Sequence, residues 1–173
     1  MERKLELKDI AGYLPYGLKI KLANGFIGEI SKIAARDYEF TAIYGNCCST
    51  DWLSWKFIGE RHKIILRPLS DLYKIITHNG KEIVPIVELA KICTKLNNGW
   101  KLDSKYNNCA RNQRTGLLFS YNEEGFATLP TQYQIFNQYQ LFDYLHELKI
   151  DYRGLVDAGL AIDVNTLDIN PYK

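Results

Sequence analysis

The sequence predicts an α+β protein, with a small antiparallel sheet in its N-terminal part and a mixed half of helices and a β-hairpin after it. Two patterns support this class. Before Pro68, apolar and polar residues alternate over short stretches, which is the period of a half-buried strand. After Pro68, apolar residues recur every three or four positions, which is the period of an amphipathic helix. Pro68 separates the two patterns, because its ring removes a backbone donor and restrains the residue before it.

The N-terminal part begins with a short amphipathic helix expected over residues 5–14, which Pro15 and Gly17 end. Expected strands follow at residues 18–22, 26–33, 38–44, 52–58 and 64–66. Asn24-Gly25 between the first two strands is a strong signal for a hairpin turn. A curved sheet of four or five such strands is compatible with closure into an SH3-like barrel.

The part after Pro68 begins with two expected helices. Ser70 can cap a helix that runs to about Thr77. Pro85 suits the first position of the next helix, which Asn97-Asn98-Gly99 ends. Residues 100–115 are polar and rich in asparagine, so we expect a long surface loop there.

The last elements are a hairpin, a helix and a closing strand. The hairpin pairs residues 117–121 with 126–129. A capping box of Thr131 and Gln134 predicts a helix to about Lys149. Its expected inner face includes Ile135, Phe136, Tyr139, Phe142 and Leu145. A strand at 160–164 then follows.

These elements predict a β-rich module at residues 1–68 and an α+β module at residues 69–173, and they leave open whether the two pack as one unit. With 46% apolar and 24% charged residues, the composition is that of an ordinary globular protein. No run approaches the roughly 18 apolar residues of a membrane span, and the first residues do not resemble a signal peptide. We therefore expect a cytoplasmic protein without membrane association.

The cysteines and histidines do not predict a metal site or a cofactor. The cysteines Cys47, Cys48, Cys93 and Cys109 lack the C-x-x-C spacing of a zinc site, so we expect free thiols. The histidines His62, His78 and His146 are scattered, and we expect His62 on a strand surface. The nucleotide-binding, dinucleotide-binding, acyl-transfer and zinc-protease motifs are absent from the sequence, so an enzyme is the less favoured class.

The basic segment, residues 91–114, holds six basic residues and one acidic residue, although the net charge of the chain is only +2. Positive charge interleaved with aromatic rings suits a phosphate backbone and stacked bases. The candidate nucleic-acid contacts are Lys91, Lys95, Trp100, Lys101, Lys105, Tyr106, Arg111 and Arg114. The alternative is a solvated surface whose charges keep the protein soluble, and the modest net charge favours that alternative.

Three aromatic residues of the N-terminal sheet are candidate contacts for a protein partner. They are Trp52, Trp55 and Phe57. Alternation places Trp55 and Phe57 on one face of the expected strand, and an exposed ring there could hold a peptide. The alternative, that these rings belong to the core, is the more common one.

Three segments resemble a group of small proteins from Bacteroides-type gut bacteria, their phages and integrated elements. The segments are LELKDIAGYLPYGL at residues 5–18, ILRPLSDL at 65–72 and GLVDAGLAIDVNT at 154–166. Together they span nearly the whole chain, so the resemblance extends to one architecture. It implies a mobile-element context. The group has no established activity, so the resemblance assigns no catalytic or binding residue.

The leading hypothesis is a non-enzymatic accessory protein of a mobile element that binds a host or phage macromolecule through a protein interface. The contact face would be the N-terminal sheet or the aromatic helix surface. One alternative is a nucleic-acid-binding accessory protein that uses the basic segment. Another is a small-ligand protein that sequesters or cleaves a nucleotide between the two halves. The oligomeric state is left open.

Overall fold

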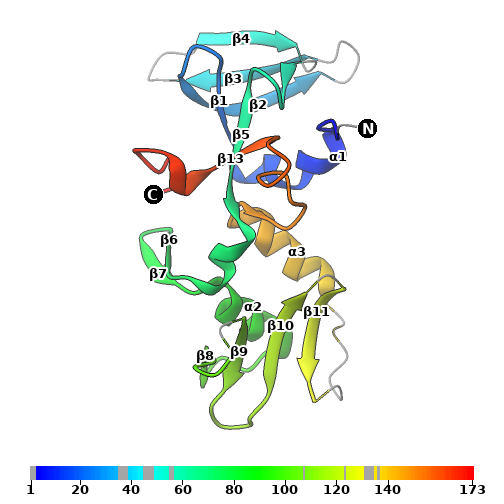
Figure 1. Ribbon diagram of the computed structural model, residues 1–173, viewed down its shortest axis with the longest axis vertical. Coiled ribbons are helices and arrows are strands. Elements are labelled where there is room, and N and C mark those ends of the chain that lie inside the picture. The colour runs from blue at the N-terminus through cyan, green and yellow to red at the C-terminus, as the bar shows by residue number, and fades with distance from the viewer. Residues whose placement is uncertain are drawn as a thin grey trace. The chain divides into compact units, whose positions relative to one another are not determined.

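A computed structural model of the chain shows an α+β protein, as the sequence predicts (Figure 1). It describes residues 3–34, 39–44, 49–54, 57–106, 108–122, 124–130, 135 and 137–173. The chain divides into two compact units. Unit 1 consists of Met1–Leu69 together with Lys149–Tyr172, and unit 2 consists mainly of Ser70–Leu148.

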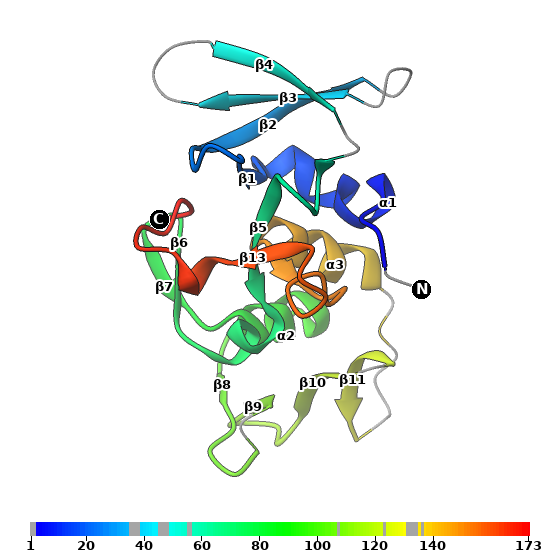
Figure 2. The same cartoon turned by 45° about the horizontal axis from the view of Figure 1, so that its top comes forward.

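Unit 1 is built on an open sheet. Its described strands follow the order β12-β5-β1-β2-β3-β4, and β13 also pairs with β5. The N-terminal strands are β1 Lys19–Lys21, β2 Ile27–Ala34, β3 Glu39–Tyr44, β4 Ser49–Ser54 and β5 Lys63–Pro68. β1 and β2 pair antiparallel with Lys21 opposite Ile27, which confirms the hairpin predicted at Asn24-Gly25. Figure 2 shows β2, β3 and β4 side by side.

The C-terminal segment of the chain returns to this sheet. Strands β12 Ile150–Asp151 and β13 Ala161–Asp163 both run parallel to β5, and Figure 1 shows β13 beside it. A short 3-10 helix, η4 Val164–Thr166, follows β13. The expected module of residues 69–173 therefore differs from the observed division, because these parallel pairs group residues 149–172 with the N-terminal strands. The SH3-like barrel is not formed by the described strands, since the order ends at β12 and β4 without closure.

The core of unit 1 is covered by the first helical segment. Here α1 Leu7–Ile10 continues into the 3-10 helix η1 Ala11–Tyr16, whereas the sequence predicts one helix over residues 5–14. Ile10 and Tyr13 are fully buried together with the inner side chains of β1 and β5. The Tyr13 hydroxyl donates a 2.8 Å hydrogen bond to the Ile150 carbonyl, so the core also holds the C-terminal segment.

The boundary predicted at Pro68 is confirmed, because β5 ends there and a helical turn begins at the next residue. The helix predicted from Ser70 to Thr77 is wrong. The structure has a 3-10 helix, η3 Leu69–Tyr73, and then a hairpin of β6 Ile76–His78 and β7 Lys81–Ile83. Asn79 and Gly80 form its turn with positive φ, so the chain reverses direction here as a β-hairpin.

Unit 2 packs two helices with a four-stranded antiparallel sheet. Its first helix, α2 Pro85–Thr94, begins at Pro85 as predicted and ends at Lys95, whose φ is 57°. The strands are β8 Trp100–Leu102, β9 Cys109–Asn112, β10 Leu118–Asn122 and β11 Gly125–Leu129, in the order β11-β10-β9-β8. The β10–β11 hairpin confirms the sequence prediction. The loop predicted at residues 100–115 is wrong, because both β8 and β9 lie within it.

The second helix of unit 2, α3 Gln138–Glu147, begins later than predicted. Residues 131–134, with the expected capping box, and Phe136 lie outside the described residues. Leu141 and Leu145 are the fully buried side chains of α3, and Phe142 is half-buried against the Phe126 ring. Tyr139, which we expected on the inner face, is 72% exposed. The buried stripe is therefore aliphatic where the sequence pattern predicts an aromatic one.

Candidate functional site

Some residues of the basic segment contribute to the core and the ion pairs of unit 2. Trp100 is only 6% exposed in β8, so its ring is not available for stacking on a base. Lys91 forms a 2.6 Å ion pair with Glu88 one turn earlier on α2. Arg111 forms an ion pair with the buried Asp103, and this hydrogen bond lowers the pKa of Asp103. These three predicted contacts are thus buried or engaged within unit 2.

The other predicted nucleic-acid contacts are exposed. They are Lys95, Lys101, Lys105, Tyr106 and Arg114. Lys101 lies directly opposite Arg111 in the β8–β9 register, so two cations share one face of the hairpin. The Lys105 ammonium lies 5.2 Å from the centroid of the Tyr106 ring. Asp103 positions both residues, because its Oδ1 accepts a 2.8 Å hydrogen bond from each of their backbone N–H groups.

The three predicted protein contacts of the N-terminal sheet are only partly described. Trp52 lies in β4, where its backbone is opposite Thr41. Its side chain, and the whole of Trp55, lie outside the described residues. Phe57 is half-buried, and the Arg61 guanidinium carbon lies 4.6 Å from the centroid of its ring. One face of the Phe57 ring is therefore covered by a cation from the same chain.

A different set of apolar side chains gathers on unit 1 and was missed by the sequence reasoning. Phe26, Ile43 and Ile169 are 60%, 42% and 80% exposed, and they line one shallow groove of about 690 Å³. We call this the apolar groove. The sequence signal was weak, because Phe26 follows the hairpin turn and Ile169 lies near the C-terminus, far from the other two along the chain.

The backbone of unit 1 brings these side chains together. The Phe26 N–H donates a 3.1 Å hydrogen bond to Asn24 Oδ1, which fixes the end of the hairpin. Gly28 permits β3 to approach, since a Cβ at this position would lie 2.9 Å from the Ile43 carbonyl oxygen. An ion pair of 2.8 Å between Lys19 Nζ and Glu29 Oε2 also lines the groove.

Tyr172 holds the C-terminal side of the groove. Its hydroxyl donates a 2.7 Å hydrogen bond to the Ile65 carbonyl and accepts one of 3.0 Å from the Lys19 N–H. Burial raises the pKa of this phenol well above its ordinary value. These two hydrogen bonds hold the segment that contains Ile169 and Pro171 next to β1 and β5. The groove therefore depends on contacts between parts of the chain that are distant in sequence.

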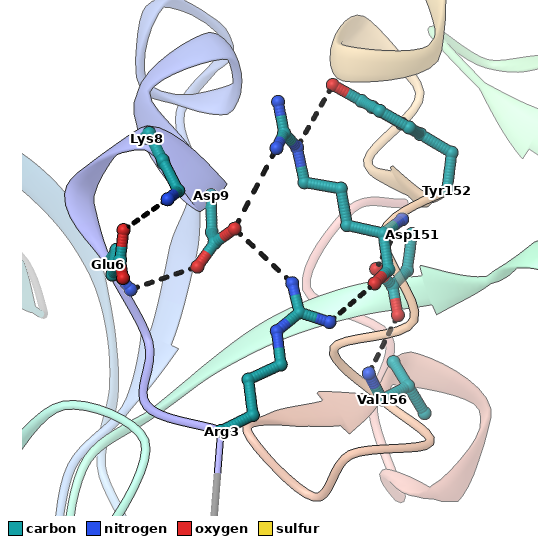
Figure 3. A network of polar contacts seen from close by, with 8 residues as sticks. Arg3, Glu6, Lys8, Asp9, Asp151, Tyr152 and Val156 are labelled. Carbon is teal, nitrogen blue, oxygen red and sulfur yellow. Dashed lines mark hydrogen bonds and ion pairs between the residues drawn. The ribbon is translucent and has the colours of Figure 1, made fainter.

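A polar network joins the first residues of the chain to the segment after β12 (Figure 3). The buried Asp9 carboxylate lies 3.3 Å from Arg3 Nη2 and 3.8 Å from Arg153 Nη1. Arg3 also donates a 2.8 Å hydrogen bond to the Arg153 carbonyl. Asp151 accepts a 2.7 Å hydrogen bond from the Val156 N–H. These contacts join the N-terminal residues to the segment after β12, so the network stabilises unit 1 and restrains the Arg3 guanidinium.

The cysteines and histidines do not converge. Cys93 is half-buried and Cys109 is buried, both thiols are free, and burial raises the pKa of each. Cys47 and Cys48 lie outside the described residues. His62 is buried, not on a strand surface as expected, and its Nδ1 accepts a 3.2 Å hydrogen bond from the Ala23 N–H. Within the described ranges, His, Cys, Asp and Glu side chains form no cluster that could hold a metal ion.

No protein-family model, curated protein or solved structure matches this chain. Among the described residues, none of the helices has the length and apolar character needed to cross a bilayer.

Proposed function

We propose that this chain is a cytoplasmic, non-enzymatic accessory protein of a mobile element, and that it binds a host or phage protein through the apolar groove. The observation that carries the proposal is the gathering of Phe26, Ile43 and Ile169, all exposed, around one depression of unit 1. Large exposed apolar side chains that lie singly are ordinary on a protein surface, whereas a contiguous patch with a polar rim is typical of an interaction site.

The energetics of the groove suit a protein partner. Full burial of a Phe or Ile side chain contributes about 1.5 to 3 kcal/mol, so three such anchors supply a substantial part of a binding free energy. The Lys19–Glu29 ion pair lies beside these anchors, which matches the polar surroundings of an interface centre. The resemblance described above supplies the mobile-element context.

The proposal is tested by site-specific photo-crosslinking in host cells. A crosslinking residue in place of Phe26 is expected to give a discrete adduct with another protein. The same residue in place of Ile75, which is similarly exposed but lies in unit 2, is the matched control and should not give that adduct. The double variant Phe26→Ser and Ile169→Ser should lose the partner in an affinity capture, whereas Ile75→Ser should retain it. Adducts only with a second copy of this chain, or equal adducts at both positions, would contradict the proposal.

A second candidate function, nucleic-acid binding, is supported by the exposed cations of unit 2. Lys101, next to the Arg111–Asp103 pair, and Lys105, beside the exposed Tyr106 ring, combine charge with a stacking surface. Phosphate contacts make affinity fall steeply with salt. If this candidate is right, Lys101→Gln should weaken binding to single-stranded DNA and reduce the salt slope by about one. Glu124→Gln, a charge change on another exposed loop of unit 2, should leave the slope unchanged.

A further inference from the structure

Unit 1 contains a second cavity, which the apolar groove does not include. It has a volume of about 700 Å³ and is formed by three separate parts of the chain: the first residues, the turn before β5 and the turn before β13. This volume lies within the range of small-molecule sites in proteins. We call it the basic pocket, for the charges described next.

The charges that line the basic pocket are mostly positive. Lys4 and Lys63 come from different segments, and neither has an ion-pair partner among the residues that the structure describes. The Arg3 guanidinium is held by Asp9 and by the Arg153 carbonyl (Figure 3), and Asp9 is shared with Arg153, so this one carboxylate faces two guanidinium groups. Glu60 is the carboxylate of the lining. Because Glu60 offsets only one of the two lysines Lys4 and Lys63, the lining keeps a net positive charge.

The position of Lys63 adds to the positive charge near the basic pocket. In the β1–β5 register Lys63 lies directly opposite Lys21, so the two side chains stand on the same face of the sheet. Lys21 also has no ion-pair partner among the described residues. Like charges directly opposite each other destabilise an antiparallel pair. An anion near Lys63 would relieve this repulsion, which gives the pocket a physical reason to take up negative charge.

The floor of the basic pocket is apolar. Leu5 and Ile58 are buried there, and Leu160 covers one side. Gly59 lies between them with a φ of +88°, and a Cβ at this position would come within 3.3 Å of Leu160 Cδ2 and 3.4 Å of Leu5 Cβ. A side chain there would be strained and would press on the two leucines. The accessible apolar part of the floor is mainly Leu160, and Lys4 and Lys63 line the same pocket.

We propose that the basic pocket binds a small organic anion, with an apolar body on the Leu5–Ile58–Leu160 floor and a carboxylate or phosphate head between Lys4 and Lys63. This site is separate from the apolar groove and does not depend on the function proposed above. Two anchoring cations and an apolar floor fit such an amphiphilic ligand better than a free inorganic ion, because an inorganic ion cannot use the floor.

The test is an NMR titration of the full chain with three probes: sodium octanoate, phenyl phosphate and inorganic phosphate. Octanoate or phenyl phosphate should give saturable shifts of the Gly59 and Gly159 amide signals, and one of the two is expected to bind more tightly. Inorganic phosphate should bind at least tenfold more weakly than that probe. Equal affinity for inorganic phosphate, or shifts confined to Phe26 and Ile43, would overturn the proposal.

Charge variants supply the decisive comparison. Lys4→Gln and Lys63→Gln should each weaken binding about tenfold, the effect of one charged hydrogen bond. Glu60→Gln should tighten binding, because it removes a repulsive carboxylate. Lys81→Gln, at an exposed lysine of β7 in unit 2, is the matched control and should bind like the parent. Unchanged affinity in both Lys4→Gln and Lys63→Gln would refute the site.

A volume variant tests the cavity itself while keeping both lysines. Ala158 is exposed and lines the pocket, so Ala158→Trp should fill it without disturbing the core. We expect the variant to retain the amide spectrum of the folded parent and to lose the octanoate or phenyl phosphate shifts. Undiminished binding by the folded variant would contradict the assignment.

Discussion

At the scale of single residues, unit 1 uses aromatic rings to accommodate a buried cation. Lys149 is 7% exposed, and its ammonium lies 5.7 Å from the Tyr16 ring centroid and 5.3 Å from that of Tyr172. Burial of a charge is unfavourable without compensation, and ring faces provide part of it. Tyr172 thus has two roles, since its ring faces Lys149 while its hydroxyl bonds the backbone of β1 and β5.

The contribution of the Tyr172 hydroxyl to stability can be measured separately from that of its ring. Tyr172→Phe keeps the ring but leaves the Lys19 N–H and the Ile65 carbonyl without their partner. We expect a loss of about 1 to 3 kcal/mol in the free energy of unfolding, measured by thermal and chemical denaturation. Tyr139→Phe removes an exposed hydroxyl and serves as the control, with little expected change. Equal stability of the two variants would show that the Tyr172 hydrogen bonds contribute nothing net.

The buried His62 is expected to make the stability of the protein depend on pH. Burial lowers the pKa of His62 below its ordinary value of 6.5, and the charge of Arg61 lowers it further. The folded chain therefore binds this proton less readily than the unfolded chain does. The contribution of neutral His62 to the stability of the folded chain is complete above about pH 6.5, and it is lost as the pH falls through the folded-state pKa. Protonation of Nδ1 would also end the hydrogen bond from the Ala23 N–H.

The measurement compares the parent with His62→Gln, whose side-chain oxygen can still accept from Ala23. Chemical denaturation from pH 8 to pH 5 should show a smaller loss of stability in the variant than in the parent. Parallel curves for the two proteins would mean that His62 does not titrate differently on folding.

At the scale of elements, the sequence was most informative where local chemistry decides the structure. Asn24-Gly25 and Pro85 are positions where backbone conformation alone selects a turn or a helix start, and both are found as predicted. The predictions for residues 70–77 and 100–115 were wrong because the structure of these segments depends on pairing with other segments. β8 and β9 are only three and four residues long, so they show little alternation of their own.

The candidate sites were predictable to a lesser extent. The sequence identified the charges of the basic segment, but it could not show that Trp100 would be buried and that Arg111 would pair with Asp103. The apolar groove and the basic pocket were not predicted at all. Each combines segments near both ends of the chain, which the pairing of β13 with β5, the Tyr172 hydrogen bonds and the Arg3 contacts bring together.

Helix α3 provides a test of which face is the core. Leu145 is fully buried, whereas Tyr139 on the same helix is mostly exposed. Leu145→Ala should lower the free energy of unfolding by about 2 to 5 kcal/mol, through lost burial and a cavity. Tyr139→Ala should change it by less than about 0.5 kcal/mol, since it removes few contacts. Urea denaturation of both variants tests this assignment. A larger loss of stability in Tyr139→Ala than in Leu145→Ala would show that the aromatic face is the buried one, as the sequence pattern predicts.

At the scale of the whole molecule, unit 2 is an insertion within unit 1. The chain leaves unit 1 at Leu69 and returns at Lys149. These two points are close within unit 1, because the Arg67 N–H donates a 2.8 Å hydrogen bond to the Lys149 carbonyl and Ile150 lies opposite Arg67 in the β5–β12 register. Leu155 and Ala161 then complete the core around Ile64 and Leu66. Unit 1 therefore needs both of its segments.

This topology predicts that unit 1 folds without unit 2. Residues 1–69 joined to residues 149–172 by a flexible linker of about six glycine and serine residues, long enough to reach back along β5, should keep the core intact. We expect cooperative thermal unfolding and dispersed methyl signals in the NMR spectrum. We also expect NOE contacts between Tyr13 and the Ile150 segment. Residues 1–69 alone form the control: they lack both parallel partners of β5 and should not unfold cooperatively, because Ile64 and Leu66 lose part of their cover. If the linked protein behaves like residues 1–69 alone, unit 1 draws its stability from unit 2, and the division into an inserted and a receiving unit is wrong.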